Sequence, residues 1–340
     1  MAERILVKDG PYGTAIQNYG LEEADYRGDL DLSADQKGNN DLLNLTRPDI
    51  IGAIANSYMD VGADILATNT FNATRISQGD YAAEHLVTDI NRAAATILRD
   101  AVDARTDGRR RFVVGAVGPT NKTLSISPDV NDPGHREVDY DEMKAVYREQ
   151  IDALAAGGVD AILIETIFDT LNAKAAAMAA MEAGDALDAG EGRDLPIMLS
   201  MTLTDMAGRN LSGQTVEAFW HSVMHTRPLT IGLNCSFGAT ELRPHVAALA
   251  KVADVPVLVY PNAGLPNEMG EYDEAPETTA ALVAEWIEAG HVNALGGCCG
   301  TTPEHIRAMA AAAAKGAPRA VPMANPALRL SGLEPFRVAA

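Results

Sequence analysis

The sequence predicts a single (β/α)8 barrel, and three observations support this fold class. Short β-branched and aliphatic runs alternate with longer alanine-rich amphipathic segments, which is the pattern of βα units around a parallel sheet. The alternation occurs eight times, the number that a closed barrel requires. The 340 residues are 47% hydrophobic, enough to bury one large core. An open doubly wound sheet is the alternative fold, and it would need fewer strands.

The elements follow one another at regular spacing. We expect strands at residues 4–9, 64–71, 112–119, 161–168, 196–204, 230–236, 256–261 and 292–298. Helices are expected at residues 49–61, 82–105, 141–156, 171–183, 215–225, 241–252, 278–289 and 303–314. Helix-capping residues support these boundaries, because Thr302-Pro303 has the form of an N-cap followed by proline at the first helical position. Glycines at 62, 157 and 290 follow helical runs, as C-terminal caps do.

Two long segments interrupt the regular alternation. Residues 21–45 are polar and glycine-bearing, and we expect them to form an insertion after the first strand, over the barrel mouth. Residues 121–140, rich in Ser, Pro and Asp, are expected to extend the loop after the third strand on the same face. Loops of this length are often functional. We assign the barrel to residues 1–316 and interpret residues 317–340, which contain several prolines, as a tail resembling a truncated interdomain linker.

Composition limits the partners and the compartment. The chain has 27 basic and 47 acidic residues, and its net charge of −20 disfavours binding to nucleic acid or to anionic membranes. The N-terminus lacks the features of a secretory signal, and no apolar run approaches the roughly 18 residues of a membrane span. Three cysteines, two of them adjacent, do not form a disulfide framework. We therefore expect a cytoplasmic protein with reduced thiols.

Polar residues end most of the predicted strands. In a barrel of this type the catalytic groups project from the carboxyl ends of the strands, so these positions are the candidates for function. They are Asp9-Gly10, Thr68-Asn69-Thr70, Gly118-Pro119-Thr120, Glu165-Thr166, Thr202, Asn234-Cys235, Asn262 and Cys298-Cys299.

All three cysteines lie at such strand ends, which indicates a metal site. Neighbouring residues of a regular strand face opposite ways, so Cys298 and Cys299 can reach one metal only where the backbone bends, and the flanking glycines allow that bend. Cys235, two strands away around the barrel, can complete a triangle of sulfurs. Catalytic zinc typically has three protein ligands and one open position. The alternative is that the cysteines are small buried hydrophobic residues.

The ligand set indicates chemistry on sulfur. Three thiolates reduce the Lewis acidity of zinc, which makes such a site poorly suited to generating hydroxide. The seven histidines also form no His-x-His or His-Glu-x-x-His motif. A metal-dependent hydrolase is therefore a weak candidate. A thiol substrate at the open position would lose its proton at neutral pH and could then attack an activated methyl group. If the substrate is an amino acid, Asp9 and Glu165 are the best ammonium partners, and backbone N–H groups around Gly10 could hold its carboxylate. Asn234 is a further candidate for substrate binding.

At these residues the chain resembles the homocysteine S-methyltransferase family. Barrels of that family carry Asp-Gly at strand one, Asn-Cys at strand six and Gly-Gly-Cys-Cys-Gly at strand eight. Within the family, the chain is most similar to the homocysteine-binding module of cobalamin-dependent methionine synthase. The runs that carry this resemblance are Gly38-Asn-Asn-Asp-Leu-Leu43, Thr68-Asn-Thr-Phe71, Ser125-Ile-Ser-Pro-Asp-Val-Asn-Asp-Pro133 and Leu163-Ile-Glu-Thr-Ile-Phe-Asp-Thr-Leu-Asn-Ala-Lys174.

The resemblance implies a cytoplasmic enzyme that makes L-methionine from L-homocysteine. It implies that the three cysteines bind zinc and act in catalysis by activating the substrate thiol. It also implies that other strand-end residues help to hold homocysteine. In this sequence the zinc ligands would be Cys235, Cys298 and Cys299, and the homocysteine-binding residues Asp9, Gly10, Thr68 and Glu165. Two departures lie near the first strands: Pro11-Tyr12 replaces small residues or Met, and Ala67 replaces an acidic residue.

The methyl donor is expected to come from another protein. Residues 329–335, Arg-Leu-Ser-Gly-Leu-Glu-Pro, resemble the junction that leads into the folate module of the full-length synthase, yet the sequence ends five residues later. We therefore expect a split system in which a separate corrinoid protein supplies methylcobalamin and a separate folate-binding methyltransferase module serves it. Two alternatives stay open. One is a homocysteine methyltransferase that uses betaine or S-methylmethionine, and the other is a noncatalytic zinc- or thiol-binding barrel that docks a corrinoid partner.

Overall fold

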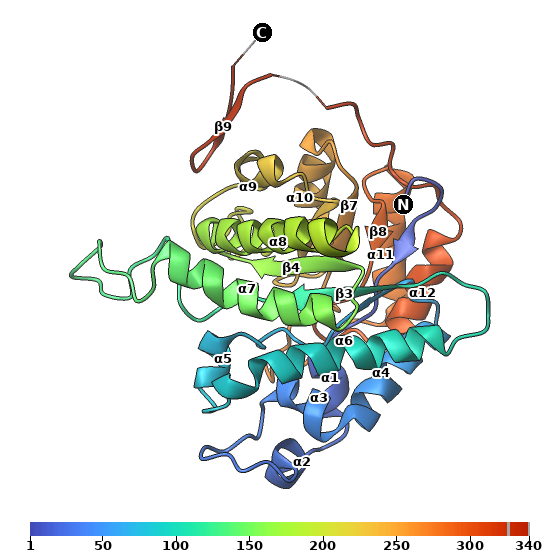
Figure 1. Ribbon diagram of the computed structural model, residues 1–340. Coiled ribbons are helices and arrows are strands. Elements are labelled where there is room, and N and C mark those ends of the chain that lie inside the picture. Colours follow the sequence, from blue (N-terminus) through green and yellow to red (C-terminus); the bar gives the residue numbers. More distant parts are fainter. Residues whose placement is uncertain (325–326, 339–340) are drawn as a thin grey trace.

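The computed structural model describes residues 1–324 and 327–338, and within them eight parallel strands form a nearly closed barrel (Figure 1). Each strand lies inside its expected range, so the predicted fold class is confirmed. The strands are β1 (Leu6–Val7), β2 (Ile65–Ala67), β3 (Phe112–Val117), β4 (Ala161–Ile167), β5 (Ile197–Met201), β6 (Thr230–Asn234), β7 (Val257–Tyr260) and β8 (Ala294–Leu295). The hydrogen-bonded order runs β1-β8-β7-β6-β5-β4-β3-β2.

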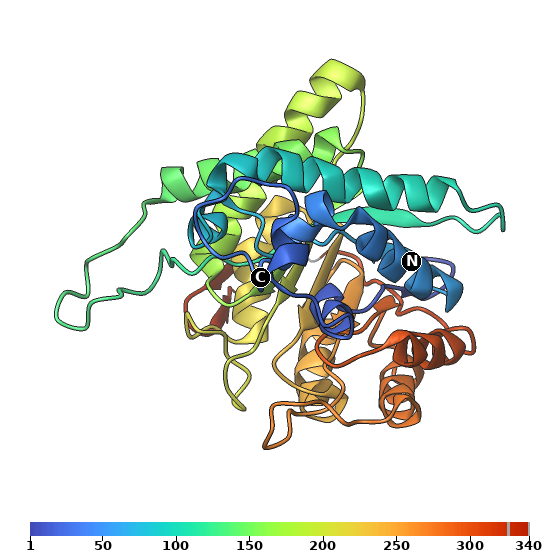
Figure 2. The same ribbon diagram turned by 90° about the horizontal axis from the view of Figure 1, so that it is seen from below.

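Helices surround this sheet, and the eight expected ones are all present in the described residues (Figure 2). They are α4 (Pro48–Asp60), α6 (Val87–Asp103), α7 (Tyr140–Ala156), α8 (Thr170–Glu191), α9 (Val216–Val223), α10 (Ala239–Val252), α11 (Pro276–Glu288) and α12 (Pro303–Ala313). Helix α8 continues through Gly184 and Gly190 to Glu191, well beyond the expected end at Ala183, because its alanine-rich sequence contains no proline, and it ends at Gly192 in the left-handed conformation. The predicted cap of α12 is confirmed, since Thr302 forms a capping box with His305.

The insertion after β1 folds into short helices instead of an irregular loop. It contains α2 (Glu23–Arg27), η1 (Asn40–Leu42) and α3 (Leu43–Thr46), and α1 (Tyr12–Gln17) precedes it. Buried leucines at 32, 42 and 43 anchor the segment, and Arg27 donates hydrogen bonds to two of its carbonyl groups. Between later strands lie α5 (Arg75–Gly79), η2 (Glu84–Leu86) and η3 (Met224–Thr226).

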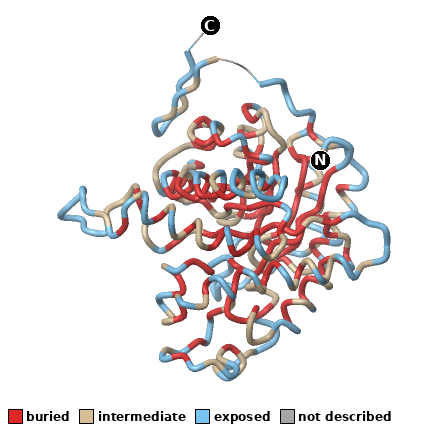
Figure 3. Tube along the Cα trace, viewed as in Figure 1, coloured by how far each residue is buried: buried red, intermediate tan, exposed pale blue. Residues whose placement is uncertain are grey.

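Side chains alternate between two apolar layers. Leu6 belongs to the cluster that fills the barrel interior, together with residues such as Leu163 and Leu258, whereas Val7 belongs to the larger cluster between strands and helices. This is the period-two alternation of a strand that is buried on both faces. Figure 3 shows the resulting burial at the centre of the molecule, with exposed residues in the peripheral loops and at the C-terminal end.

The segment after α12 partly folds back on the barrel. Strands β9 (Arg329–Ser331) and β10 (Pro335–Arg337) form an antiparallel hairpin. Ser331 Oγ donates to the carbonyl of Ala218 in α9 at 2.6 Å, and the Thr215 amide donates to the carbonyl of Leu333 at 3.1 Å. Residues 325–326 and 339–340 of the expected tail, Pro326 among them, lie outside the described residues. Among the described residues, no helix is both long and apolar enough to cross a membrane.

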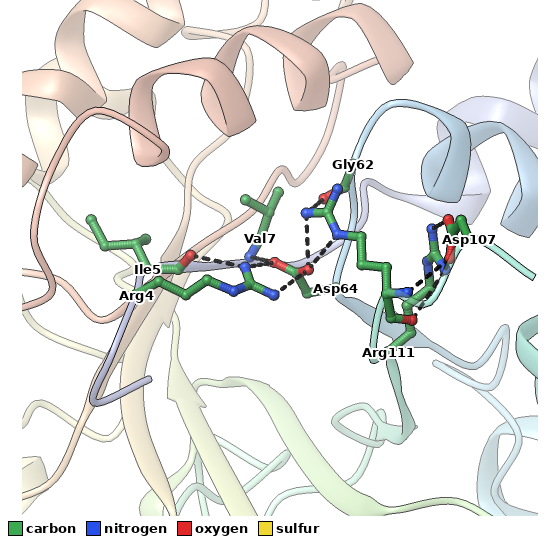
Figure 4. Close-up of polar contacts among 8 residues, drawn as sticks. Arg4, Ile5, Val7, Gly62, Asp64, Asp107 and Arg111 are labelled. Carbon is green, nitrogen blue, oxygen red and sulfur yellow. Dashed lines mark hydrogen bonds and ion pairs between the residues drawn. The ribbon is translucent and has the colours of Figure 1, made fainter.

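A buried carboxylate supports the pairing of β1 with β2, which is the least extensive strand pairing of the barrel. Strands β1 and β2 share only the bridge between Lys8 and Ile65. Just below this bridge, Asp64 accepts a hydrogen bond from the Val7 amide at 3.0 Å and two from the Arg4 guanidinium at 2.7 and 2.8 Å (Figure 4). Arg109 donates a further hydrogen bond to it at 3.1 Å. Asp64 therefore ties β1 to β2 at the end of the barrel opposite the strand-end cysteines.

Replacement of this carboxylate should destabilise the fold in a pH-dependent way. Burial alone would raise the pKa of Asp64, but the hydrogen bonds from Arg4 and Val7 outweigh it and lower the pKa. A lowered folded-state pKa means that the stabilisation is present above the unfolded-state pKa and is lost as the pH falls. We expect Asp64→Asn to lower the free energy of unfolding at neutral pH by roughly 2 kcal/mol.

Urea unfolding at neutral and acidic pH measures this effect. The control is Asp89→Asn, which removes the exposed pair with Arg92 and should change stability by less than about 0.5 kcal/mol. Equal losses for the two variants, or a loss at Asp64 that does not shrink at acidic pH, would contradict the assigned role.

Candidate active site

The structure brings the three cysteines together at the carboxyl ends of β6 and β8. The Sγ atoms of Cys235, Cys298 and Cys299 all lie within 4.8 Å of one another, and those of Cys235 and Cys299 are 3.7 Å apart. Zinc bound tetrahedrally by sulfur at about 2.3 Å would separate its ligands by about 3.8 Å. The three thiols therefore have the spacing of three ligands to one tetrahedral metal ion, and their donor chemistry fits zinc.

Unusual backbone conformations make this convergence possible. Cys235 and Ser236 both have positive φ angles, 61° and 64°, which side-chain-bearing residues rarely adopt. After β8, a Cβ on Gly297 would come within 2.1 Å of Thr301 Oγ1. A Cβ on Gly300, where φ is 77°, would come within 2.1 Å of Tyr272 Cβ. The turns that present the thiols thus require glycine at two positions and a strained conformation at two side-chain-bearing residues.

The thiols share protons within the cluster. Hydrogen bonds from Cys235 and then from Cys298 lower the pKa of the Cys299 thiol to about 3. Hydrogen bonding to Cys235 and Cys299, reinforced by burial, raises the pKa of Cys298 well above its usual value. Three neighbouring sulfurs cannot all ionise without a compensating cation, because like charges repel strongly at this distance. The cluster is therefore suited to a divalent ion that would stabilise all three thiolates.

A buried ion pair lies beside the cluster at the top of β1. Lys8 Nζ donates to Asp9 Oδ1 at 2.8 Å, and the Ala67 amide donates to Asp9 Oδ2 at 2.9 Å. Both residues are almost completely buried. Burial raises the pKa of Asp9, while Lys8 opposes that shift. For Lys8, burial lowers the pKa, but the negative charges of Asp9 and Glu165 raise it above the usual value.

Glu165 faces this pair from β4. Its Oε2 accepts a hydrogen bond from the Tyr260 hydroxyl at 2.9 Å. The Lys8 ammonium lies 4.8 Å from the centre of the Tyr260 ring, within the range of a cation–π contact. Burial raises the pKa of Glu165, and the positive charge of Lys8 opposes the shift. The strand ends therefore hold two carboxyl groups around one ammonium.

Asn234 lies between the turn at Thr166 and the turn at Cys235. It is not among the residues that line the cavity beside the cysteines. Its Oδ1 accepts hydrogen bonds from the Thr166 amide at 3.0 Å and from Ser200 Oγ at 2.6 Å. Its Nδ2 donates to Thr166 Oγ1 at 2.8 Å. Thr166 also has a positive φ, 55°, so this amide connects the turn after Glu165 with the turn that presents Cys235. The geometry favours a positioning role over the direct substrate contact expected from the sequence.

The other two expected residues, Thr68 and Gly10, do line the cavity. Thr68 Oγ1 accepts from the Ala116 amide at 2.9 Å and contacts Thr70 Oγ1 at 2.6 Å, so its hydroxyl is engaged by the protein. A Cβ on Gly10 would meet the Tyr58 hydroxyl at 2.7 Å, which explains why glycine is needed there.

This cavity has a volume of about 630 Å³, and Glu165 and the three cysteines also line it, whereas Asp9 does not. Beside the expected residues, its wall contains further side chains that the strand-end pattern does not identify, among them Lys8, Tyr12, Asp41, Tyr260 and Tyr272. Two of these residues, Lys8 and Tyr260, could have been predicted from strand alternation. Lys8 lies two residues after Leu6 and Tyr260 two residues after Leu258, and Leu6 and Leu258 point into the barrel.

The other three lie outside the strands, Tyr12 at the start of α1, Asp41 in η1 and Tyr272 in the loop after β7, so their placement depends on tertiary structure. Asp41 belongs to the folded insertion. Its Oδ1 accepts from the Asn72 amide at 2.9 Å, and burial raises its pKa to about 7. Tyr272 follows β7 and lies beside the thiols. Burial and then the negative charge of Cys299 raise the pKa of Tyr272 to about 12.

The family described as homocysteine S-methyltransferase matches residues 6–313 of the chain. Among solved structures, the metallated form of the homocysteine methyltransferase MmuM from Escherichia coli is 21% identical, with a TM-score of 0.69, covering 91% of this chain and 96% of that chain. Its oxidized form is 20% identical with the same TM-score, covering 90% and 95%. At this identity the likeness to the solved structures demonstrates a shared fold.

The positioning role of Asn234 leads to a testable expectation. Asn234→Ala removes three buried hydrogen bonds that support the turns at Thr166 and Cys235, so we expect affinity for zinc to fall roughly 10- to 100-fold. The measurement is competition for zinc with a chromophoric chelator. A matched control is Asn91→Ala, which removes two buried hydrogen bonds, to Ala73 and Val87, away from the site. Equal zinc affinity in the two variants would contradict the role.

Proposed function

Because the chain belongs to the homocysteine S-methyltransferase family, we propose that it transfers a methyl group to the sulfur of L-homocysteine and forms L-methionine. The observation that carries this proposal is the meeting of three thiols at 4.8 Å or less on the wall of a cavity that is also lined by Glu165 and by Lys8, the hydrogen-bond partner of Asp9. A sulfur-rich metal site suits a thiol substrate, and the carboxyl groups suit an ammonium.

Cys235, Cys298 and Cys299 would hold zinc as thiolates. Zinc in such a site supplies the positive charge that keeps a coordinated thiol deprotonated at neutral pH. The protein side chains then have two tasks. They hold the substrate so that its sulfur lies at the cluster, and they leave the opposite side of that sulfur open to the donor.

The ammonium of homocysteine would be held by Glu165 and Asp9. Both oxygens of Asp9 already accept hydrogen bonds from the protein, whereas only Oε2 of Glu165 does so among the described residues. Glu165 is therefore the better direct partner, and Asp9 adds negative charge. In this proposal Thr68 and Gly10 line the wall against which the substrate chain packs, and a Gly10 side chain would displace Tyr58.

Loss of a thiol should remove the metal. We expect Cys235→Ala to bind less than about a tenth of the zinc of the wild type and to lose homocysteine binding, because two thiolates do not complete a structural or catalytic zinc site. The measurements are elemental analysis of purified protein and calorimetric titration with homocysteine. His85→Ala, which removes an exposed candidate ligand remote from the cluster, serves as the control. Zinc and homocysteine binding that persist in Cys235→Ala would refute the site.

We propose methylcobalamin on a corrinoid protein as the methyl donor, with a folate-binding methyltransferase module to remethylate it. Exposed large apolar side chains on the loops around the barrel mouth support a macromolecular donor. Such residues follow six of the eight strands at their carboxyl ends, where a docked protein would remove their apolar surface from water. They are Tyr19, Phe71, Val130, Leu171, Met206, Leu211, Leu265 and Met269.

The long loop after β3 extends this surface. It projects away from the barrel in both views (Figure 1, Figure 2). Its base is held by Asp169, which accepts hydrogen bonds from the Ser125 amide at 2.8 Å and from Ser125 Oγ at 2.7 Å. Val130 near its tip is 92% exposed. A small donor such as betaine has no need of contacts so far from the cavity.

A charge placed on the mouth should impair a protein donor selectively. Met269, 83% exposed on the loop after β7, is a suitable position, and Met323, 95% exposed beyond α12, is its matched control. We expect Met269→Glu to lower kcat/KM with a methylcobalamin-loaded corrinoid protein roughly tenfold and to leave the rate with free methylcobalamin unchanged. Met323→Glu should change neither rate.

A donor panel distinguishes the alternatives. Turnover with betaine or S-methylmethionine, and none with the corrinoid protein, would overturn the donor assignment while leaving homocysteine as the substrate. Zinc and corrinoid-protein binding without turnover of any donor would instead identify a noncatalytic barrel. We place the activity in the cytoplasm, where the three free cysteines would stay reduced.

A further inference from the structure

Lys8 is a buried cation inside the barrel whose hydrogen-bonding capacity is only partly used. It is 4% exposed and has the same strand parity as Leu6, so its side chain enters the barrel interior. An ammonium carries three donors. Among the described residues, Nζ donates to one acceptor, Asp9 Oδ1 at 2.8 Å, and otherwise faces the Tyr260 ring.

The unused donors of Lys8 belong to the wall of the cavity that contains the thiol cluster. Tyr12, from α1, lines the same cavity, and its hydroxyl is buried without a hydrogen-bond partner among the described residues. A buried donor without an acceptor costs roughly 1–3 kcal/mol, so two unmet donors on one cavity wall indicate a ligand that accepts hydrogen bonds.

The same cavity offers an acceptor for the opposite charge. Glu165 Oε1 has no hydrogen-bond partner among the described residues, although Oε2 accepts from Tyr260. The wall therefore presents unmet positive and neutral donors together with an unmet negative acceptor. This pattern is complementary to a zwitterion, because each of its charged ends finds a partner of opposite polarity.

We infer that Lys8, assisted by Tyr12, binds the α-carboxylate of the amino-acid thiol substrate and thereby selects thiols that carry both an ammonium and a carboxylate. This inference rests on the proposed function and adds a specificity determinant to it. A phosphate or other multiply charged anion fits less well, because Glu165, Asp41 and Glu271 bring three carboxyl groups to the wall of the same cavity. A carboxylate on a carbon that also carries an ammonium avoids that repulsion.

The experiment measures binding of three thiols to the zinc-loaded enzyme by calorimetry. The thiols are L-homocysteine, 3-aminopropane-1-thiol, which lacks the carboxylate, and 4-sulfanylbutanoate, which lacks the ammonium. We expect Lys8→Met to raise Kd for homocysteine and for 4-sulfanylbutanoate roughly 10- to 100-fold and to change Kd for 3-aminopropane-1-thiol by less than about threefold. Lys251→Met, which removes an exposed lysine of α10, should leave all three unchanged.

A second variant protects the test against misfolding, since Lys8→Met leaves Asp9 buried without its ammonium partner. Tyr12→Phe removes only a hydroxyl and should weaken binding of the two carboxylate-bearing thiols roughly 3- to 10-fold, with the same selectivity. Equal weakening of all three thiols in both variants would overturn the inference and reduce Lys8 to a counter-ion. If the wild-type enzyme with zinc binds none of the thiols, the proposed function itself fails.

Discussion

The site depends on one geometric constraint, the convergence of three sulfur atoms from two strands that are separated by β7. Regular strands cannot achieve it, because adjacent side chains face opposite ways. The chain meets the constraint with a positive φ at Cys235 and with glycines around Cys298 and Cys299 that admit no Cβ. Such conformations persist only where surrounding contacts hold them. The amide of Asn234, through its hydrogen bonds to Thr166 and Ser200, is one of these contacts.

The amino end of the barrel contributes to stability, whereas the carboxyl end contains the candidate active site. The interior is apolar in its middle, where Leu6, Leu163 and Leu258 pack together, and Asp64 with its arginines closes the β1–β2 seam at the amino end. The carboxyl end instead buries Lys8 and several carboxyl groups, an arrangement that costs desolvation energy. Functional sites commonly carry such costs, and the rest of the fold offsets them.

Much of this arrangement could be predicted from the sequence, for identifiable reasons. Eight apolar runs separated by amphipathic segments predict a barrel, and the barrel places Asp9, Glu165 and the cysteines at one face. The polar strand-end pattern does not identify Lys8, because Lys8 precedes the end of the strand and only the period-two alternation from Leu6 places its side chain inside the barrel. Asp41 could not be found in this way, since the insertion is positioned by tertiary contacts. The β9–β10 hairpin likewise depends on α9, to which it hydrogen-bonds.

The distribution of charge also limits how the donor can approach. In the proposed function the substrate sulfur would lie at the thiol cluster and its charged end toward Lys8 and Glu165, because these are the groups of matching chemistry on the cavity wall. Every one of these groups lies at the carboxyl end of a strand, so the proposed methyl transfer would take place from the side of the loops. Those loops carry exposed apolar side chains such as Met206 and Met269. A donor embedded in a protein can bury that surface, whereas a small free donor would leave it in water.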